Sequence, residues 1–493
     1  MVQPIPIAYR AKHSIELLPS MANRHGCITG ATGTGKTVSL QVLAEAFSRQ
    51  GTAVFAADIK GDLSGITQAG QPNEKITQRL QRYEIPEPEW GANPAVFWDV
   101  LAEQGHPIRV TVSDLGPVLL SRMLELNDTQ EGVMNILFRV ADEEGLLLLD
   151  FKDLRAMLTY VGENASELRK KYGNIAPASV GAIQRALLRL EDEGAEYFFG
   201  EPTLDIFDWI RTDASGRGIV NILAADRLIQ SPRLYAIFLL WMMAELYERL
   251  PEVGDLSQPK MVFFFDEAHL LFNTAPKALL ERIEQVLRLI RSKGVGVYFV
   301  TQSPGDIPDV ILGQLGHRIQ HALRAYTPRE QKAVRTVAQT MRPNPDLDIQ
   351  AAITELGVGE ALVSMLDSEG RPTITERAWM AAPASRIGPA TLEEKQNIQN
   401  TSPLAGKYDT VIDRESAYEL LEERVAKQAQ EQAQSEQSSG GALGALSDFL
   451  IGSTGPRGGR RDGVVQSVIK SEVRRGARQL LRGLLSSLRG GGR

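Results

Sequence analysis

The sequence predicts an α/β protein with a mostly parallel central β-sheet, a helical insertion and a flexible basic C-terminal tail. Short, β-rich apolar runs recur throughout the first 380 residues, and helical patterns separate them. A glycine-rich turn joins the first buried run to a helix. Strands that alternate with helices are typical of a parallel sheet covered on both faces by helices.

Length and composition agree with a large folded core. The chain has 493 residues, of which 43% are hydrophobic, and this length suggests two or three domains. Its net charge of −7 gives no whole-chain sign of nucleic-acid binding. The single cysteine, Cys27, cannot form an intramolecular disulfide, and residues 1–20 show no secretory signal, so we expect a cytoplasmic protein. The longest apolar run, Leu234–Met243, is too short to span a bilayer.

Eight segments read as strands, and one long interval between them reads as helical. The expected strands are His25–Thr29, Ala53–Asp58, Ile108–Val112, Gly218–Leu223, Met261–Asp266, Val295–Thr301, Arg318–Leu323 and Ala361–Leu366. Leu115–Phe199 carries helical periodicity almost throughout, as in Thr129–Asp142 and Ser179–Gly194, and is expected to form an insertion. The expected boundaries are 1–114 and 201–390 for the core, 115–200 for the insertion, 391–463 for a charged and glycine-rich linker, and 464–493 for the tail.

The strongest motif is the octapeptide GATGTGKT at Gly30–Thr37, between an apolar strand and the helical pattern Val38–Arg49. Glycines let the backbone approach phosphate oxygens, and the helix N-terminus supplies positive potential. Lys36 would reach the β- and γ-phosphates of ATP, while the Thr37 hydroxyl would bind Mg²⁺. The alternative is a chance match in a turn. The candidate nucleotide-binding residues are Gly30, Ala31, Thr32, Gly33, Thr34, Gly35, Lys36, Thr37 and Val38.

An acidic pair closes a fully apolar strand, Met261–Phe265. Asp266 is expected to hold Mg²⁺ through its water shell, and Glu267 to orient and polarise the attacking water. The alternative is a buried strand followed by acids that cap a helix. His269, two residues further on, is more typical of a structural cap than of a catalyst.

Polar residues at other strand ends are further candidates. Gln302 follows the strand Val295–Thr301, where an amide could sense the γ-phosphate or position water; the alternative is a glutamine that only caps the strand. Arg288 and Arg291 share one face of the helical pattern Lys277–Lys293 and could reach the ATP of a neighbouring subunit. A solvated face with an ion pair to Glu284 is the alternative reading.

Two more groups have an open role. Arg24 lies just ahead of the first predicted buried strand and is a second candidate for a neighbour's ATP. Asp58 ends the strand Ala53–Asp58, and Asp62 follows four residues later. Either acid could assist metal or water, but an aspartate that ends a strand and starts a turn is common.

Together these segments resemble the HerA/FtsK branch of RecA-like motors. The resemblance rests on Asn23–Thr37, on Asp266-Glu267, on Arg291–Gly296 and on Thr301–Pro304, and covers roughly 17–389. Within the branch, the chain looks most like the bacterial YjgR family of HerA-like proteins.

The resemblance implies a fold, an assembly and a set of roles. It implies a RecA-like αβα sandwich, a ring that is usually hexameric, and DNA or another polymer in the central pore. It places the phosphates and metal on Lys36 and Thr37, water activation on Glu267, γ-phosphate sensing on Gln302, and a trans-acting arginine finger on Arg291. One departure is that only 29 residues precede Gly30, so we expect no β-barrel of the archaeal HerA kind and no certain partnership with a HerA-type nuclease.

The expected tail is strongly basic. From Arg457 to Arg493 there are ten Lys and Arg residues against two acids, with apolar residues at helical spacing. This pattern suits DNA, an anionic membrane surface, or docking against the acidic body of the protein.

The sequence therefore predicts an ATP-hydrolysing, hexameric motor that acts on double-stranded DNA as a translocase or helicase. A protein-remodelling motor and a nucleotide-dependent switch or scaffold with slow hydrolysis are the alternatives.

Overall fold

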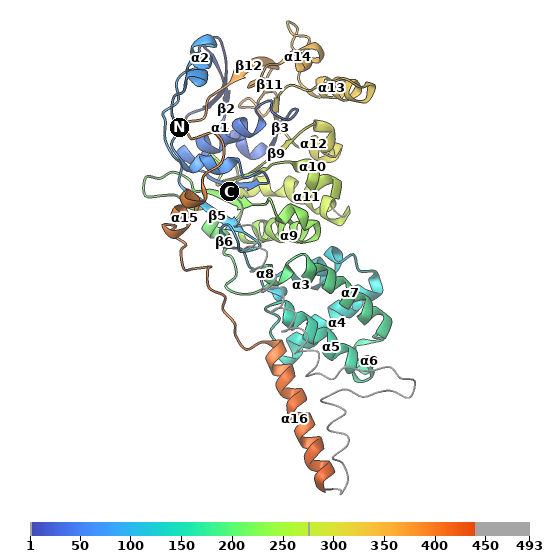
Figure 1. Cartoon of the computed structure of the whole chain (residues 1–493). Helices are drawn as coiled ribbons and strands as arrows, with labels where there is room; N and C mark the ends of the chain where they lie inside the picture. Colours follow the sequence, from blue (N-terminus) through green and yellow to red (C-terminus); the bar gives the residue numbers. More distant parts are fainter. Residues whose placement is uncertain (1, 275–276, 439–493) are drawn as a thin grey trace, which may run out of the picture. The chain divides into compact units, whose positions relative to one another are not determined.

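A computed structural model describes residues 2–274 and 277–438, which contain one 12-stranded sheet (Figure 1). The strand order is β2-β1-β12-β11-β10-β3-β9-β8-β4-β7-β5-β6. The strands are β1 (Ile5–Arg10), β2 (His13–Leu17), β3 (Gly26–Thr29), β4 (Ala53–Asp58), β5 (Ala95–Asp99), β6 (His106–Pro107), β7 (Val220–Ala224), β8 (Met261–Phe265), β9 (Val295–Thr301), β10 (His317–Gln320), β11 (Glu360–Ser364) and β12 (Glu376–Met380).

The strands from β10 to β6 in this order pair in parallel, whereas β2, β1, β12 and β11 extend the sheet by antiparallel pairing. This mostly parallel sheet confirms the predicted α/β class. Because β3, β9, β8 and β4 are parallel neighbours, their carboxyl ends meet at one edge of the sheet. The loops that follow these four strands therefore lie together.

Helices cover both faces of the parallel strands. The helices are α1 (Lys36–Arg49), α2 (Glu74–Arg82), α3 (Val112–Met123), α4 (Asp128–Glu144), α5 (Phe151–Glu163), α6 (Ala165–Tyr172), α7 (Pro177–Asp192), α8 (Ala195–Phe198), α9 (Pro232–Arg249), α10 (Ala268–Thr274), α11 (Lys277–Ile290), α12 (Asp309–Leu312), α13 (Pro328–Thr340), α14 (Ile349–Glu355), α15 (Leu392–Asn400) and α16 (Ala417–Ser438). Short 3₁₀ turns include η3 (Ile206–Trp209) and η5 (Arg291–Lys293).

The alternation of side chains along each strand divides the core into two layers. On one face Phe47 of α1 packs against Phe264 and Tyr298, with ring centroids 6.4 and 6.2 Å apart. On the other face Phe263 packs against Phe55, 5.2 Å away, beneath the aromatic side chains of η3 and α9. Figure 1 shows α1 and the pair α9 and α11 on opposite sides of the sheet. Large rings on both faces make each central strand fully buried, which explains its continuous apolar sequence.

One predicted strand is wrong, and five observed strands were not predicted. In place of a strand at Ile108–Val112 there is the two-residue β6 and a single bridge between Val110 and Phe199, and α3 already begins at Val112. The Thr111 hydroxyl accepts a hydrogen bond from the Asp114 amide at 3.0 Å, and this capping box starts the helix. The missed strands, β1, β2, β5, β6 and β12, lie toward the two ends of the sheet.

Six helices, α3 to α8, follow one another between Val112 and Phe198. The periodic stretch predicted at Thr129–Asp142 lies within α4, which Asn127 caps and which ends at Gly145 in a left-handed conformation. In Figure 1 these helices lie together as a group of their own, with α3 packed on α9.

The compact unit extends further than the expected boundary at 390, because it reaches Ala417. Tyr408 is fully buried, its ring centroid lies 5.6 Å from that of Trp98, and its carbonyl accepts a hydrogen bond from Arg109 at 2.7 Å. The segment after residue 390 is charged in composition, yet Tyr408 anchors it to the compact unit. A second unit begins at Tyr418 with α16. The tail at 464–493 lies outside the described residues.

No helix among residues 2–274 and 277–438 is long and apolar enough to cross a bilayer.

Candidate active site

The phosphate loop connects β3 to α1 at the carboxyl edge of the sheet. Gly33 has φ +78° and Gly35 has φ +114°, conformations that residues with a Cβ rarely adopt. Backbone hydrogen bonds hold the loop on both sides, from Ala31 N to the Ala322 carbonyl at 2.8 Å and from Gly359 N to the Thr34 carbonyl at 2.9 Å. The exposed tip at Thr32-Gly33 is thus carried on a fixed turn that leads directly into the N-terminus of α1.

Lys36 is buried under this loop. Its side chain is directed back across the turn, where Nζ donates a hydrogen bond to the Ala31 carbonyl at 3.1 Å. Burial lowers the pKa of Lys36, while Glu267 and Asp266 act in the opposite direction. A buried ammonium whose hydrogen-bond acceptor is a neutral carbonyl favours an added anion, which is the partner that a phosphate would supply.

The acidic pair lies at the carboxyl end of β8, and only β9 separates β8 from β3. Asp266 and Glu267 are both buried, and Asp266 Oδ1 accepts a hydrogen bond from the Glu267 amide at 2.8 Å. Burial raises the pKa of Asp266 to about 6. Glu267 has φ +46°, a left-handed conformation that is uncommon for a residue other than glycine. Such local strain is frequent at functional sites.

An ion pair holds the Glu267 carboxylate. Lys60, in the loop after β4, donates from Nζ to Glu267 Oε1, and His269 Nδ1 lies 3.1 Å from Glu267 Oε2. Burial opposes ionisation, but the hydrogen bond and charge of Lys60, with His269 and Lys36, together lower the pKa of Glu267 below its ordinary value. The carboxylate is therefore ionised, as a base must be, and is engaged by a lysine that the sequence analysis did not consider.

Asp58 has a structural position in the turn after β4. Its two oxygens accept hydrogen bonds from the amides of Gly61 at 2.8 Å and Leu63 at 3.1 Å. Burial, reinforced by Asp62, raises its pKa to about 7. These bonds match the turn-starting alternative for Asp58.

The donor set fits a hard cation that is held mainly by water and substrate. Among the described residues, no group of three or more His, Cys, Asp or Glu side chains is arranged to hold a metal ion. Asp62 Oδ1 is a buried oxygen without a hydrogen-bond partner in that part of the chain. Mg²⁺ keeps several waters and takes one or two protein oxygens beside substrate phosphates, so Thr37 and Asp266 suffice as protein ligands.

Gln302 lies at the same edge. It follows β9, which is the strand between β3 and β8, and its side chain is exposed. The next turn is fixed by Asp306, whose Oδ2 accepts hydrogen bonds from the Thr301 hydroxyl at 2.8 Å and from the Ser303 amide at 2.9 Å. The structure thus brings Gln302 to the edge that carries the phosphate loop.

The candidate arginines lie at the opposite edge. Arg24 precedes the amino end of β3, while Arg288 in α11 and Arg291 in η5 precede the amino end of β9. All three line one cavity with a volume of about 590 Å³. The structure therefore does not bring them to the phosphate loop of their own chain.

A second residue that the sequence analysis missed supports the phosphate loop. His321 is fully buried after β10; its Nδ1 lies 3.0 Å from the Glu360 carbonyl and its Nε2 lies 2.9 Å from the Ser39 hydroxyl. The carbonyl requires a proton on Nδ1, so Nε2 accepts from Ser39 and ties α1 to β10. Lys60 follows the predicted strand Ala53–Asp58, and His321 lies within the predicted strand Arg318–Leu323. Their places at strand ends could have indicated them had lysine and histidine been considered beside the acids.

The fold and this site define a P-loop ATPase of the HerA/FtsK type. The family described as helicase HerA-like C-terminal matches residues 6–493. The chain belongs to this family. The narrower likeness to the YjgR family stays a prediction.

Several solved structures are similar to this chain, among them a bacterial conjugative coupling protein. The conjugative coupling protein TrwBΔN70 in an unbound form has a TM-score of 0.50 and 12% identity, covering 78% of this chain and 91% of that chain. TrwB with the non-hydrolysable GTP analogue GDPNP has a TM-score of 0.50 and 14% identity, with the same coverage. VirB4 of Thermoanaerobacter pseudethanolicus has a TM-score of 0.47 and 16% identity, covering 80% of this chain and 97% of that chain. The two TrwB matches show the fold alone. No curated protein sequence matches this chain.

Proposed function

We propose that the chain hydrolyses ATP with Mg²⁺ as a ring-forming motor in the cytoplasm, and that it moves along double-stranded DNA as a translocase or helicase. The observation that carries the ATPase part is the convergence of Lys36, Thr37 and the pair Asp266-Glu267 at one sheet edge. The backbone from Gly30 to Val38 would hold the phosphates.

The chemistry follows from the positions of these groups. Lys36 exchanges the Ala31 carbonyl for β- and γ-phosphate oxygens, which is favourable because the ammonium is buried. Thr37, and Asp266 through water, would hold Mg²⁺, which would supply neutralising charge beside the phosphates. Glu267 orients the attacking water and takes up its proton, and Gln302 contacts the γ-phosphate or that water.

Lys60 gives the site a resting state. Its ammonium engages Glu267 Oε1, so that this oxygen is not free to contact a water. A γ-phosphate is a stronger partner for an ammonium than a single carboxylate oxygen, because it offers more charge. ATP would therefore draw Lys60 away and free Glu267 for the water.

The position of Arg24 and Arg291 supports an assembly, with a hexameric ring as the expected form. β3 is 4 residues long, so these arginines are separated from the phosphate loop of their own chain by roughly 13 Å of strand. They can act as fingers only on the nucleotide of another copy. Hydrolysis would then require contact between subunits.

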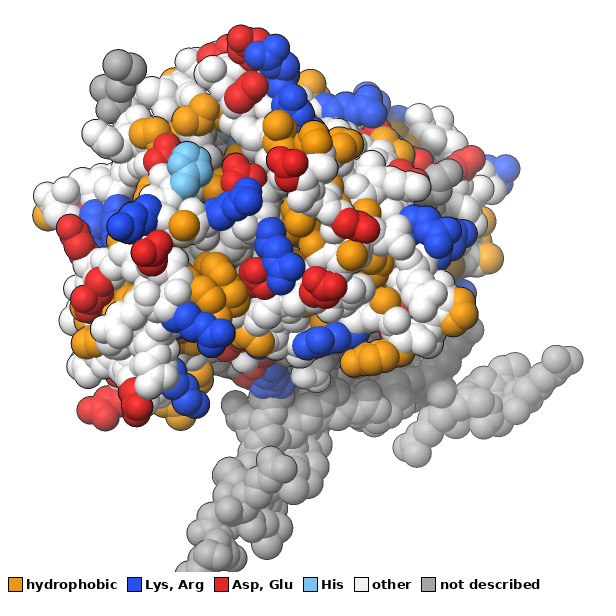
Figure 2. All heavy atoms as spheres, turned by 90° about the horizontal axis from the view of Figure 1, so that it is seen from above, with side chains coloured by type: hydrophobic (Ala, Val, Ile, Leu, Met, Phe, Trp, Pro, Cys, Tyr) orange, Lys and Arg blue, Asp and Glu red, His pale blue; other side chains and the backbone are white. Residues whose placement is uncertain are grey.

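Membership of the helicase HerA-like family and a fold shared with a plasmid coupling protein support DNA as the polymer. The face shown in Figure 2 carries basic and acidic side chains interspersed, so the DNA path is not placed on it. The tail at 464–493, basic by sequence, is a further candidate for contact with DNA, with an anionic membrane surface or with the protein itself.

The test is ATP turnover by the full-length protein with duplex DNA, single-stranded DNA or neither, at several salt concentrations. We expect strong stimulation by duplex that weakens as salt rises. The Lys36→Ala variant is the control for contaminating ATPases. Equal turnover in all three conditions would contradict the DNA motor and favour a protein-remodelling motor or a nucleotide-dependent switch.

A further inference from the structure

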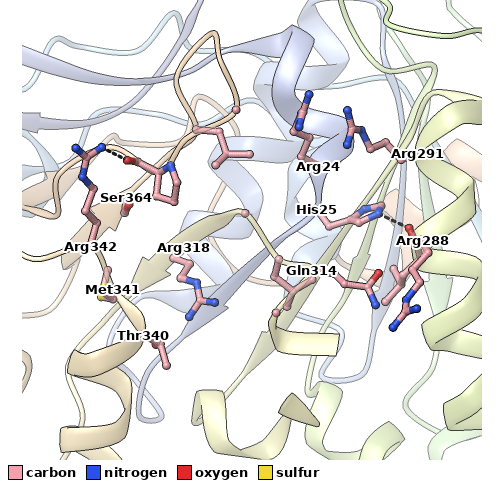
Figure 3. A pocket seen from close by; sticks show the side chains of 17 residues that line it. Arg24, His25, Arg288, Arg291, Gln314, Arg318, Thr340, Met341, Arg342 and Ser364 are labelled. Atoms are coloured by element: carbon pink, nitrogen blue, oxygen red, sulfur yellow. Dashed lines mark hydrogen bonds between the residues drawn. The ribbon is translucent and has the colours of Figure 1, made fainter. Parts of the chain in front are cut away.

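The cavity at the amino edge of the sheet has an unusual composition. Five arginines from four separate parts of the chain line it, namely Arg24, Arg288, Arg291, Arg318 and Arg342 (Figure 3). Among the described residues, no aspartate or glutamate lines it. This contrasts with the interspersed charges on the face in Figure 2.

Several of these guanidinium groups are poorly neutralised. Arg318 donates to the Leu312 carbonyl at 3.2 Å, and Arg342 donates to the Pro372 carbonyl, so their hydrogen-bond acceptors here are neutral. Arg291 lies 3.9 Å from Asp255, whose side chain is 92% exposed. Such an exposed ion pair does little to neutralise the Arg291 charge. Only Arg288 has a close carboxylate partner, Glu284.

Like charges also face each other in the cavity. Figure 3 shows Arg24 and Arg291 side by side above His25. Burial lowers the pKa of Arg291, and the neighbouring Arg24 lowers it further. His25 adds no charge: the Val297 amide donates to its Nδ1 at 3.0 Å, so the proton is on Nε2, which donates to the Leu287 carbonyl at 2.8 Å. His25, which follows Arg24, is thus hydrogen-bonded to α11. The two arginines that repel each other are therefore held on fixed backbone.

We infer that this cavity is a second phosphate-binding site, which takes the di- or triphosphate group of a phosphorylated ligand. Guanidinium groups bind phosphate by paired, charge-assisted hydrogen bonds, and several of them around one cavity match several phosphate groups. The volume of about 590 Å³ is within the range of small-molecule sites. The ligand is either free in solution or the nucleotide held by a second copy of this chain.

The binding test uses inorganic triphosphate and full-length Lys36→Ala protein, in which the phosphate loop is disabled. Calorimetric titration near physiological salt is expected to give one site per chain. Arg318→Gln should weaken binding by about tenfold, because it removes one charge-assisted contact. Arg122→Gln is the matched control, since Arg122 is exposed on α3, outside the cavity, and its loss should leave affinity unchanged.

Either of two results would overturn the site: no saturable binding of triphosphate, or equal affinity in the Arg318→Gln and Arg122→Gln proteins. Thermal unfolding checks that each variant is folded. If Arg318→Gln is not folded, Arg342→Gln replaces it, because Arg342 is exposed and its loss disturbs less packing. This arm uses no turnover, so its outcome is independent of the proposed ATPase function.

A mixing experiment distinguishes the two sources and rests on the proposed function. Full-length Lys36→Ala and Arg318→Gln proteins are assayed for ATP turnover separately and mixed. Turnover restored in the mixture assigns the site to the nucleotide of a second copy, because one partner supplies the phosphate loop and the other the cavity. Two other outcomes are wild-type turnover by Arg318→Gln alone and no restoration in the mixture. If the cavity binds triphosphate, either outcome means that its ligand is free in solution.

Discussion

The two edges of the same parallel strands differ in how their charged groups are assembled. At the carboxyl edge, Lys36 and the pair Asp266-Glu267 stand in short contiguous motifs, and positive and negative groups balance each other. At the amino edge, arginines from separate segments gather with little compensation. A site of balanced charge is ready for a substrate that carries its own metal, whereas a site of one sign requires an anion. The comparison suggests that one chain binds phosphate at both edges.

Replacing Arg291 gives the largest expected effect on turnover. If this guanidinium acts on the nucleotide of a second copy, Arg291→Ala should reduce kcat by about 10³–10⁵-fold while ATP binding persists. Turnover and equilibrium ATP binding are measured on the same preparation. Arg122→Ala is the control, because Arg122 is exposed on α3 and lies outside the cavity. Wild-type-like turnover in Arg291→Ala would remove the amino edge from the hydrolysis reaction.

Replacing Glu267 tests the carboxyl edge. Glu267→Gln keeps the size of the side chain but cannot accept the water proton, so we expect turnover to fall by about 10²–10⁴-fold with ATP retained uncleaved. Single-turnover analysis of bound nucleotide provides the measurement. Recovery of bound ADP at the wild-type rate would assign water activation to another residue.

Each edge of the sheet also has a buried, neutral histidine, which should make the free energy of unfolding depend on pH. Burial lowers the pKa of His25 and of His321 to about 4, against 6.5 ordinarily. The unfolded chain therefore binds protons that the folded one does not between these values, and stability is lost as pH falls through this window. Each histidine should contribute roughly 3 kcal/mol to this loss.

Denaturant unfolding of wild type and His321→Asn at pH 7.5 and 4.5 measures this contribution. The variant should lose less stability than wild type on acidification. His13→Asn is the control, because His13 is exposed on β2. Identical acid losses in wild type and His321→Asn would mean that His321 is not held neutral in the folded state.

The smallest expected effect concerns the lysine that engages Glu267. Burial raises the pKa of Glu267 and the Lys60 ammonium opposes it, so removal of this ammonium should raise that pKa. The acid limb of the kcat/KM profile of Lys60→Ala should then move to higher pH, with a change of only a few-fold at neutral pH. Lys60→Arg should retain the wild-type limb. An unshifted limb in Lys60→Ala would show that the ion pair does not control this base.

Features that depend on neighbouring residues in the sequence could be predicted. The turn at Gly33 and Gly35 is encoded by glycine itself, and the strand before Asp266 by unbroken burial, so the phosphate loop and acidic strand end could be predicted. Contacts between distant segments could not. Lys60 meets Glu267 across 207 positions of sequence, and no periodicity indicates such a pair.

The same limit explains the errors in the fold. Ile108–Val112 is apolar enough for a strand, but the Thr111 cap takes its last residue into a helix. Tyr408 anchors a segment whose composition is typical of a linker. The arginine cavity could not be predicted either. Arg318 and Arg342 stand in no recognisable motif, and only the fold brings β10 and the segment after α13 beside β3.

The central claim is that a triphosphate binds between the phosphate loop and the acidic strand end, and equilibrium binding of a labelled ATP analogue tests it most directly. We predict saturable binding by the wild-type protein that requires Mg²⁺ and is lost, together with turnover, in Lys36→Ala. Wild-type protein that fails to bind the analogue with Mg²⁺ present, or equal binding by Lys36→Ala, would contradict the account.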